Sequence, residues 1–526
     1  MLILTASSLL FLAPTIIVAV RYFRPKFRQY WLSCVIAGGI ALFLLILAPF
    51  LKPGEINLST WRPEELFPLS PLLLADRITW MFSLSLTVLL LATLLVSATQ
   101  KTFTRQSFRD VPQWLSLLYL ASVTIFSLMA GNLLTLIFAW TALDIAELLI
   151  WLGIPGVRPD AKKLALNLAA RFTSLYILFF AGVISFSAYL PSGFSDLNPP
   201  IRVLIYTACT LRLIALPLSS PLNGGNRQPS LALDILQIMP FGTYLILLAR
   251  LSQPVQGTSI NTALLVILVF LSTVFALLWA FSANKTSGLP YWLVSTALLC
   301  LCASYLGQLE GSVVWGLTVI FSGGLLYLFF SQRKTSRLIL YFGLFNLTAL
   351  PLSTTWLLVN LFSEPTSPLV YLLFMPMGLI LAAYFDFIAR QDRESLGAER
   401  WMLLIYPAGL LLLPLINLLT VWFVIQTGQF SAGVIPPLGA SWPGLVVISM
   451  AGLVVLLIRR PGSMPIRTLD ALRNLTSLGW LYRFVEFALR LAGLVLLTGN
   501  SVLEGRGGII WSLLLLTLVF AVLYQS

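Results

Sequence analysis

Charged side chains within apolar stretches are the residues of this sequence best suited to chemistry. Asp144 and Glu147 share the stretch 132–154 and lie about 60° apart around a helix axis, and Arg212 lies in the middle of 201–218. An ionisable group inside a membrane is costly unless it is paired, so each of these residues is a functional candidate. We expect Arg212 to pair with Asp144 or Glu147, and all three to belong to an ion pathway.

Two further charged residues lie near the ends of apolar stretches. Asp234 follows the polar loop 223–230 and is another candidate for the ion pathway. Arg171 lies near the start of the stretch 164–189, and its long side chain can extend toward Lys162 and Lys163 at the membrane surface. We therefore expect a structural role for Arg171. An alternative for the whole set is a purely structural ion pair.

The residue types present disfavour several classes of enzyme. The sequence contains no His, which is the commonest general base, metal ligand and proton shuttle. Its four cysteines all lie inside apolar runs, where we expect them to serve in packing: Cys34, Cys209, Cys300 and Cys302. No motif for a flavin, an iron–sulfur cluster or a nucleotide is present. We therefore expect no cofactor and no catalysis by the chain alone.

The composition predicts that membrane-spanning helices position these residues. Hydrophobic residues make up 59% of the chain and charged residues 10%, against about 25% charged in soluble proteins. The apolar runs have about the 20 residues that a span requires. We predict an all-α integral membrane protein with about 14 core spans and extra terminal spans. The runs lie near 2–20, 31–51, 78–98, 112–130, 132–153, 164–189, 201–218, 230–251, 260–283, 290–307, 311–331, 338–362, 369–389, 401–426, 442–458 and 508–524.

The basic residues indicate the orientation. The 32 Lys and Arg are scattered over short loops, which is typical of topology signals and not of a nucleic-acid surface. They concentrate in alternate loops, starting with the loop that follows the first span, so we expect the N-terminus outside and a location in the inner (plasma) membrane. Charges in 465–497 fall along one side of a helix. We expect 465–490 to be an amphipathic helix on the cytoplasmic surface, and leave open whether 483–497 spans.

Internal prolines predict two broken helices. Pro217 and Pro351 each follow an apolar run, and broken helices at membrane depth occur inside protein or beside a hydrated cavity. We predict interruptions near 217–221 and 351–354, related as inverted repeats. The expected domains are 1–110 with an outer loop, repeats at 111–250 and 251–425, and C-terminal spans with the amphipathic helix at 426–526.

Several short segments resemble the antiporter-like subunits of respiratory complex I, Mrp cation/proton antiporters and membrane-bound hydrogenases. Met129 to Trp140 reads Met-Ala-Gly-Asn-Leu-Leu-Thr-Leu-Ile-Phe-Ala-Trp, which is similar to the family's Asn-Leu-Leu…Phe-Trp-Glu. Matches also occur at Asp76, 212–218, 240–250, 350–351 and 503–511. The resemblance runs from about residue 70 to the C-terminus. It implies a membrane subunit that works beside other membrane subunits and carries no cofactor.

The departures from this family concern its proton-relay residues. The Glu that follows the family's Trp falls on Thr141, and the family's buried Lys becomes Arg212, which stays protonated. The family's His falls near Asp234, and its Asp-x-Lys-Arg motif leaves only a displaced Lys285. The resemblance therefore implies a degenerate relay, with Lys285 as a further candidate.

Two hypotheses follow. In the first, the chain is an antiporter-like subunit of a complex I-related, Mrp-like or hydrogenase-like assembly, with a largely structural or coupling role. The assembly itself would be a redox-driven NAD(P)H or quinone oxidoreductase-like complex or a cation antiporter. In the alternative, the chain is a stand-alone secondary transporter of an ion or small solute, with its site at the breaks near Pro217 and Pro351.

Overall fold

The computed structural model divides the chain into two compact units, Met1–Arg473 and Asn474–Ser526. It describes residues 1–459 except for 25–28, 51–53, 58–70, 100–110, 154–159, 188–193, 195–196, 220–234, 253–261, 283–287, 331–333, 364–367, 391–400 and 427–440. Beyond these it describes only residues 483, 487, 490, 491, 493, 494 and 512–517.

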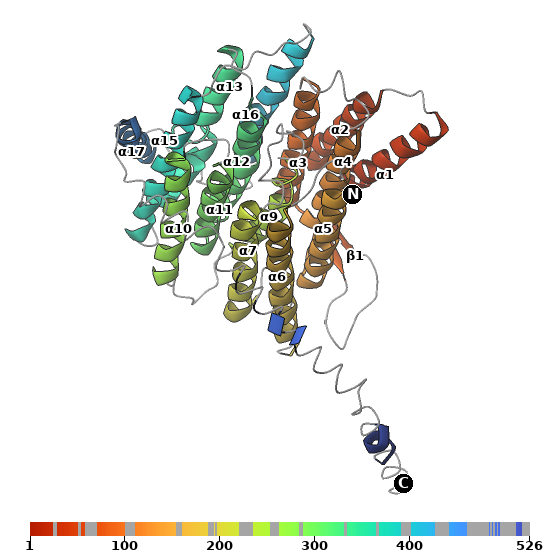
Figure 1. The fold of residues 1–526 in the computed structure, drawn as a ribbon. Coiled ribbons are helices and arrows are strands. Elements are labelled where there is room, and N and C mark those ends of the chain that lie inside the picture. Colours follow the sequence, from red (N-terminus) through yellow and green to blue (C-terminus); the bar gives the residue numbers. More distant parts are fainter. Residues whose placement is uncertain are drawn as a thin grey trace. The chain divides into compact units, whose positions relative to one another are not determined.

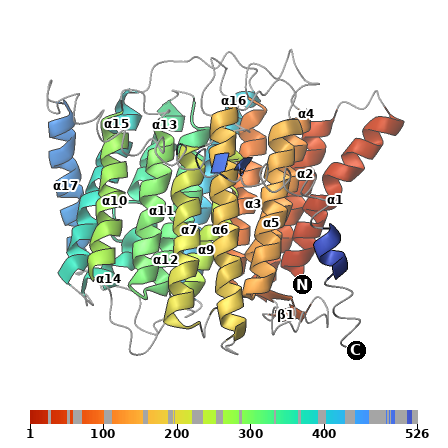
Figure 2. The ribbon, with the colours of Figure 1, turned by 60° about the horizontal axis from the view of Figure 1, so that its bottom comes forward.

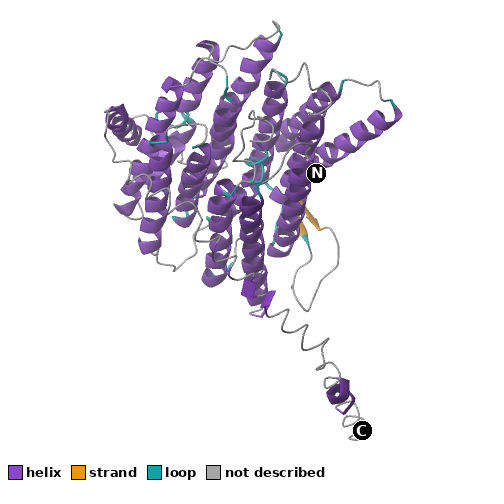
Figure 3. Ribbon diagram, viewed as in Figure 1, coloured by secondary structure: helices purple, strands orange, loops and turns teal. Residues whose placement is uncertain are grey.

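The first unit consists almost entirely of helices that stand side by side, with α1 and α17 at opposite ends (Figures 1, 2 and 3). Ten of the described helices are long and apolar enough to cross a membrane, which confirms the prediction of a multi-pass membrane protein. The helices are α1 (Leu2–Phe23), α2 (Tyr30–Leu47), α3 (Arg77–Ser97), α4 (Val111–Leu128), α5 (Leu133–Gly153), α6 (Ala161–Ser187), α7 (Pro199–Leu218), α9 (Phe241–Leu251), α10 (Thr262–Ala280), α11 (Leu289–Tyr305), α12 (Leu309–Leu328), α13 (Lys334–Phe345), α14 (Val359–Ser363), α15 (Phe374–Arg390), α16 (Met402–Gln426) and α17 (Trp442–Arg459).

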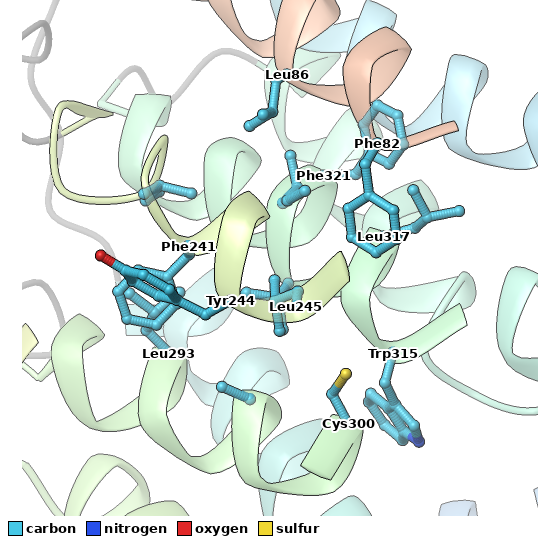
Figure 4. Packing of buried hydrophobic residues seen from close by; sticks show 14 of the residues in the cluster. Phe82, Leu86, Phe241, Tyr244, Leu245, Leu293, Cys300, Trp315, Leu317 and Phe321 are labelled. Atoms are coloured by element: carbon cyan, nitrogen blue, oxygen red, sulfur yellow. The ribbon is translucent and has the colours of Figure 1, made fainter. Parts of the chain in front are cut away.

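The centre of this unit is α12, whose residues are nearly all buried. Its neighbours include α3, α9, α11 and α16. Glycines on α12 permit this close packing: a Cβ at Gly316 would lie 2.7 Å from Phe82 of α3, and one at Gly323 would lie 2.9 Å from Trp292 of α11. Figure 4 shows the resulting layer, in which Phe82, Leu317 and Phe321 pack beside α9.

A two-stranded hairpin lies before α3. Strands β1 (Gly54–Asn57) and β2 (Leu72–Ala75) pair antiparallel, with Gly54 opposite Ala75. Strand β2 also contacts the α4–α5 connection, because Leu74 N–H donates to the Met129 carbonyl at 2.7 Å and Gly131 N–H to the Leu72 carbonyl at 2.9 Å. The sequence predicted a non-helical insert here but not strands, since four residues are too few to show an alternating pattern.

The first predicted break lies partly outside the described residues. Helix α7 ends at Leu218, one residue after Pro217. Ser219 follows in a turn, and the chain is next described at Ile235. The predicted span 230–251 needs correction, because turns occupy 236–240 and helix α9 begins only at Phe241. Pro240 explains this start, since a proline disfavours helical geometry in the residue before it and suits the first positions of a helix.

The second predicted break is confirmed, with an earlier start. Helix α13 ends at Phe345, residues 346–353 form a non-helical segment with turns at both ends, and a 3-10 helix at Thr354–Leu358 leads into α14. Pro351 cannot continue a helix, because its ring clashes with the carbonyl four residues earlier. Ala349 and Leu352 have φ of 53° and 70°, a conformation that non-glycine residues rarely adopt. The inverted-repeat relation and the domain boundaries stay predictions.

Gly444 of α17 lies directly against this break. A Cβ there would lie 2.6 Å from the Ala349 carbonyl oxygen and 2.9 Å from that of Thr348, both backbone atoms that cannot move aside cheaply. We expect Gly444→Ala to lower the free energy of unfolding by about 1–3 kcal/mol. The matched control is Gly452→Ala on the same helix, where nothing lies within 4 Å. Thermal unfolding should leave this control unchanged or slightly stabilised; equal losses in both variants would contradict the prediction.

The second unit is described only in part. Residues 512–517 are helical and lie within the predicted span 508–524. The predicted amphipathic helix at 465–490 falls mostly outside the described residues and stays a prediction.

Candidate ion-pair cluster in the membrane

Three neighbouring helices place four charged side chains together. Helix α5 carries Asp144 and Glu147, α6 carries Arg171, and α7 carries Arg212. Helix α5 packs on α6, and α6 on α7. The start of α5 is set by Asn132, whose side-chain oxygen accepts hydrogen bonds from Thr135 N–H at 2.9 Å and Thr135 Oγ1 at 2.7 Å. Such a cap satisfies donors that a helix leaves unpaired at its first turn.

Asp144 joins the two arginines. Its Oδ1 accepts from Arg171 Nη1 at 2.6 Å and from Arg212 Nη1 at 2.9 Å, and its Oδ2 accepts from Arg212 Nη2 at 2.7 Å. Of the two partners predicted for Arg212, Asp144 is therefore the one that pairs with it. The Asp144 side chain is 12% exposed, whereas both arginine side chains are nearly inaccessible.

Arg171 contradicts the expectation that it extends toward the membrane surface. Its side chain is 3% exposed and donates to Glu147 Oε2 at 2.5 Å as well as to Asp144. Its Nε donates to Asn167 Oδ1 at 2.7 Å. The physical reason is charge balance, because a single arginine would leave two buried carboxylates to share one positive charge. The guanidinium also lies over the Trp151 ring, 5.1 Å from its centroid.

Arg212 uses all the hydrogen-bonding capacity of its guanidinium. Besides Asp144, it donates from Nε to Ser174 Oγ at 2.9 Å, from Nη1 to Tyr244 Oη at 3.2 Å, and from Nη2 to the Arg171 carbonyl at 3.4 Å. The group also lies 4.3 Å from the Trp140 ring centroid, and Trp140 meets Tyr244 edge to face. Figure 4 shows Tyr244, whose hydroxyl is one of these partners of Arg212, on α9. Five donors are the most that an arginine offers.

The cluster is electrically neutral, with two carboxylates and two guanidiniums. One acceptor remains open, because Glu147 Oε1 is buried and has no hydrogen-bond partner among the described residues. Arginines stay protonated in proteins, so they bind and orient charge but do not pass on a proton. The arrangement can therefore hold a fixed electrostatic field, and only its carboxylates can exchange protons.

The other predicted site residues are not among the described members of this cluster. Asp234 and Lys285 fall outside the described residues, Pro217 lies in the last turn of α7, and Pro351 lies in the break after α13. The described part of the chain contains no group of three acidic or cysteine side chains that could hold a metal ion.

Sequence reasoning missed the polar residues that complete the cluster. Asn167, Arg171 and Ser174 are spaced four and three positions apart, so they share one face of α6. That spacing was the available signal. The Asn167 amide also donates to Ser219 Oγ at 3.2 Å, which ties α6 to the end of α7. Tyr244 carried no such signal, because its role depends on how α9 packs.

A second contact between charged residues, Asp76 and Arg250, lies at the end of the bundle next to the hairpin. Asp76 caps α3 by accepting from Thr79 N–H at 2.7 Å, and Arg250 at the end of α9 lies 3.6 Å from Asp76 Oδ1. Arg250 also donates to Thr79 Oγ1 at 2.8 Å and to the Ala130 carbonyl. These contacts hold α9, α3 and the α4–α5 connection together.

Comparison with known proteins identifies the fold. The sequence matches no protein-family model and no curated protein. Among solved structures, a chain of the Mrp complex from Dietzia sp. DQ12-45-1b superposes with a TM-score of 0.69 and 11% identity, over 99% of this chain and 63% of that chain. This chain thus spans about 63% of the length of the Mrp chain.

Two respiratory assemblies contain similar chains. A chain of the membrane-bound sulfane sulfur reductase, an archaeal respiratory membrane complex, gives a TM-score of 0.63 and 14% identity over 98% of this chain and 99% of that chain. A chain of respiratory complex I from Thermus thermophilus gives 0.57 and 16% identity over 80% of this chain and 98% of that chain. The resemblance inferred from short sequence segments is confirmed at the level of the fold.

Proposed function

We propose that this chain, which shares its fold with membrane chains of Mrp, complex I and sulfane sulfur reductase assemblies, is an antiporter-like subunit of a multi-subunit ion-translocating assembly. Its partners are other membrane subunits and the lipid bilayer, and it carries out no catalysis alone. On the evidence of its basic loops, we place it in the inner (plasma) membrane with the N-terminus outside.

Within such an assembly the chain has a structural or coupling role. The observation that carries this proposal is the closed cluster around Asp144, in which all five Arg212 donors have partners. A relay of protons needs groups that bind and release them, and an arginine at the centre of the cluster does not release its proton. Within the neutral cluster, the Arg212 guanidinium is instead a fixed positive charge whose field acts on neighbouring groups.

The proposal is tested by measuring proton flux with the purified full chain in vesicles, using a pH-sensitive dye and an imposed membrane potential. We expect the native chain to conduct no faster than protein-free vesicles. Arg212→Lys should raise the flux severalfold, because a buried lysine can lose its proton. Arg390→Lys is the control, since Arg390 also pairs with an aspartate, at 2.8 Å, but lies half exposed at a helix end.

Rapid proton flux through the native chain, or no change with Arg212→Lys, would overturn the fixed-charge role. Recovery of a stable multi-subunit assembly on purification from native membranes would support the subunit assignment. The second candidate function is a stand-alone secondary transporter, which the buried break after α13 favours. Solute or ion uptake by the purified chain alone would select that candidate.

A further inference from the structure

Four buried side chains near the break after α13 carry polar atoms without a hydrogen-bond partner among the described residues. They are Thr318 Oγ1 on α12, Asn346 Oδ1 after α13, Tyr384 Oη on α15, and both side-chain polar atoms of Asn417 on α16. Each residue is at most 1% exposed. A buried polar group without a partner is destabilising, so such groups normally bind one another, water or an ion.

Contacts along the helices place these side chains within about two helical turns of one another along the bundle. The Asn346 amide donates to the Pro414 carbonyl at 3.3 Å, and Asn417 lies one turn beyond Pro414. Phe330 N–H donates to Tyr406 Oη at 2.9 Å, so α13 and α16 run in the same direction. Asn417 therefore lies beside the break that follows Asn346.

The other two residues, Thr318 on α12 and Tyr384 on α15, also lie near the break. A Cβ at Gly343 would lie 2.8 Å from Tyr384 Oη and 2.5 Å from Leu325, which places both one turn before Asn346. At the other end of α12, a Cβ at Gly311 would lie 3.5 Å from Leu358, which follows the break. Thr318 lies midway between positions 311 and 325, hence alongside the break.

We infer that Thr318, Asn346, Tyr384 and Asn417 form a binding site for a monovalent cation such as Na⁺ or K⁺ beside the break in α13. Hydroxyl and amide oxygens are suitable ligands for such hard cations. Helix α13 ends there with no basic residue in its last turn, so the negative end of its dipole favours a cation over a neutral water. Asp386, which shares α15 with Tyr384, is already bonded to Arg390 at 2.8 Å.

The break itself suits such a site. Ala349 and Leu352 hold the left-handed backbone conformation within the turn, which keeps the helix open at this depth. Unwound segments and helix ends are the usual places where membrane proteins coordinate cations. The site lies in helices α12 to α16, whereas the Arg212 cluster lies in α5 to α9. Its occupancy therefore does not depend on the proposed fixed-charge role.

The test is the thermal unfolding midpoint of the purified full chain in NaCl, KCl and choline chloride at constant ionic strength. We expect the midpoint to rise saturably with Na⁺ or K⁺ relative to choline, because a ligand of the native state stabilises it by mass action. Asn417→Leu should weaken the apparent affinity roughly tenfold or more. Thr318→Val, which keeps the side-chain shape, should also weaken it.

The matched control is Ser336→Ala, which removes another buried hydroxyl without a partner, about 15 Å earlier along α13. It should leave the cation dependence unchanged. If Asn417→Leu does not fold, retention of radioactive Na⁺ by the native chain and by Thr318→Val decides the matter. Equal midpoints in all three salts, with no retained Na⁺, would overturn the cation site and assign these side chains to bound water.

Discussion

Replacing Arg171 with leucine is expected to lower the free energy of unfolding by roughly 3–5 kcal/mol. Arg171 is the described partner of Glu147 Oε2, at 2.5 Å, and its loss leaves a buried carboxylate without a positive partner. Asp144 would keep two hydrogen bonds from Arg212. The loss of stability should therefore come mainly from the unpaired Glu147. It should appear as a large drop in the unfolding midpoint of the detergent-purified chain.

The choice of second mutation makes this prediction specific. Arg171→Leu with Glu147→Leu should recover most of the lost stability, because the remaining Arg212–Asp144 pair is balanced. Arg171→Leu with Asp144→Leu should recover little, since no hydrogen bond or ion pair joins Arg212 to Glu147 among the contacts described. Arg24→Leu, at an exposed position after α1, should change stability by about 0.5 kcal/mol or less. Equal rescue by both second mutations would contradict the pairing.

Arg212→Leu is expected to cost a similar amount, roughly 3–5 kcal/mol, for a different reason. This change removes both hydrogen bonds that Arg212 makes to Asp144 and leaves Ser174 and Tyr244 without their donor. It also leaves Arg171 to balance two carboxylates. Adding Asp144→Leu should recover much of the loss, because the Arg171–Glu147 pair then remains neutral.

The conservative change separates charge from geometry. Arg212→Lys keeps the positive charge while the lysine is protonated, but it cannot reproduce two parallel bonds to Asp144 together with those to Ser174 and Tyr244. We expect it to destabilise the chain less than Arg212→Leu, as measured by the same unfolding midpoint. A loss as large as that of Arg212→Leu would mean that hydrogen-bond geometry, and not charge, is what stabilises the cluster.

Much of the fold was predictable, because membrane helices reveal themselves through length and hydropathy alone. Most predicted spans agree with helices to within a few residues, as in 201–218 against α7. The break after α13 was predictable from proline, although it begins at Asn346, because the proline ring disturbs the preceding turn. The two four-residue strands could not be predicted from the sequence, since their pairing is a tertiary contact.

The contacts of the site were predictable only where a residue type requires a particular kind of partner. A buried Arg212 needs a carboxylate, and the sequence offered Asp144 and Glu147, of which the structure pairs Asp144 with it. Whether Arg171 extends outward or inward depends on the rotation of α6 against α5, which helix periodicity within one segment does not determine. The same holds for Tyr244, whose place follows from the packing of α9.

Helix α9 has a consequence for how the chain is built into the membrane. All of its residues are buried, and it packs among α3, α4, α7, α11 and α12. At 1.5 Å per residue it covers roughly 16 Å, about half of the hydrocarbon thickness, and it ends beside Arg250. Such a segment cannot partition into lipid as an independent span. We therefore expect α9 to pack during biogenesis only after the hairpin, α3 and α4 are in place. These elements supply a surface away from lipid and the oxygen atoms to which Arg250 binds.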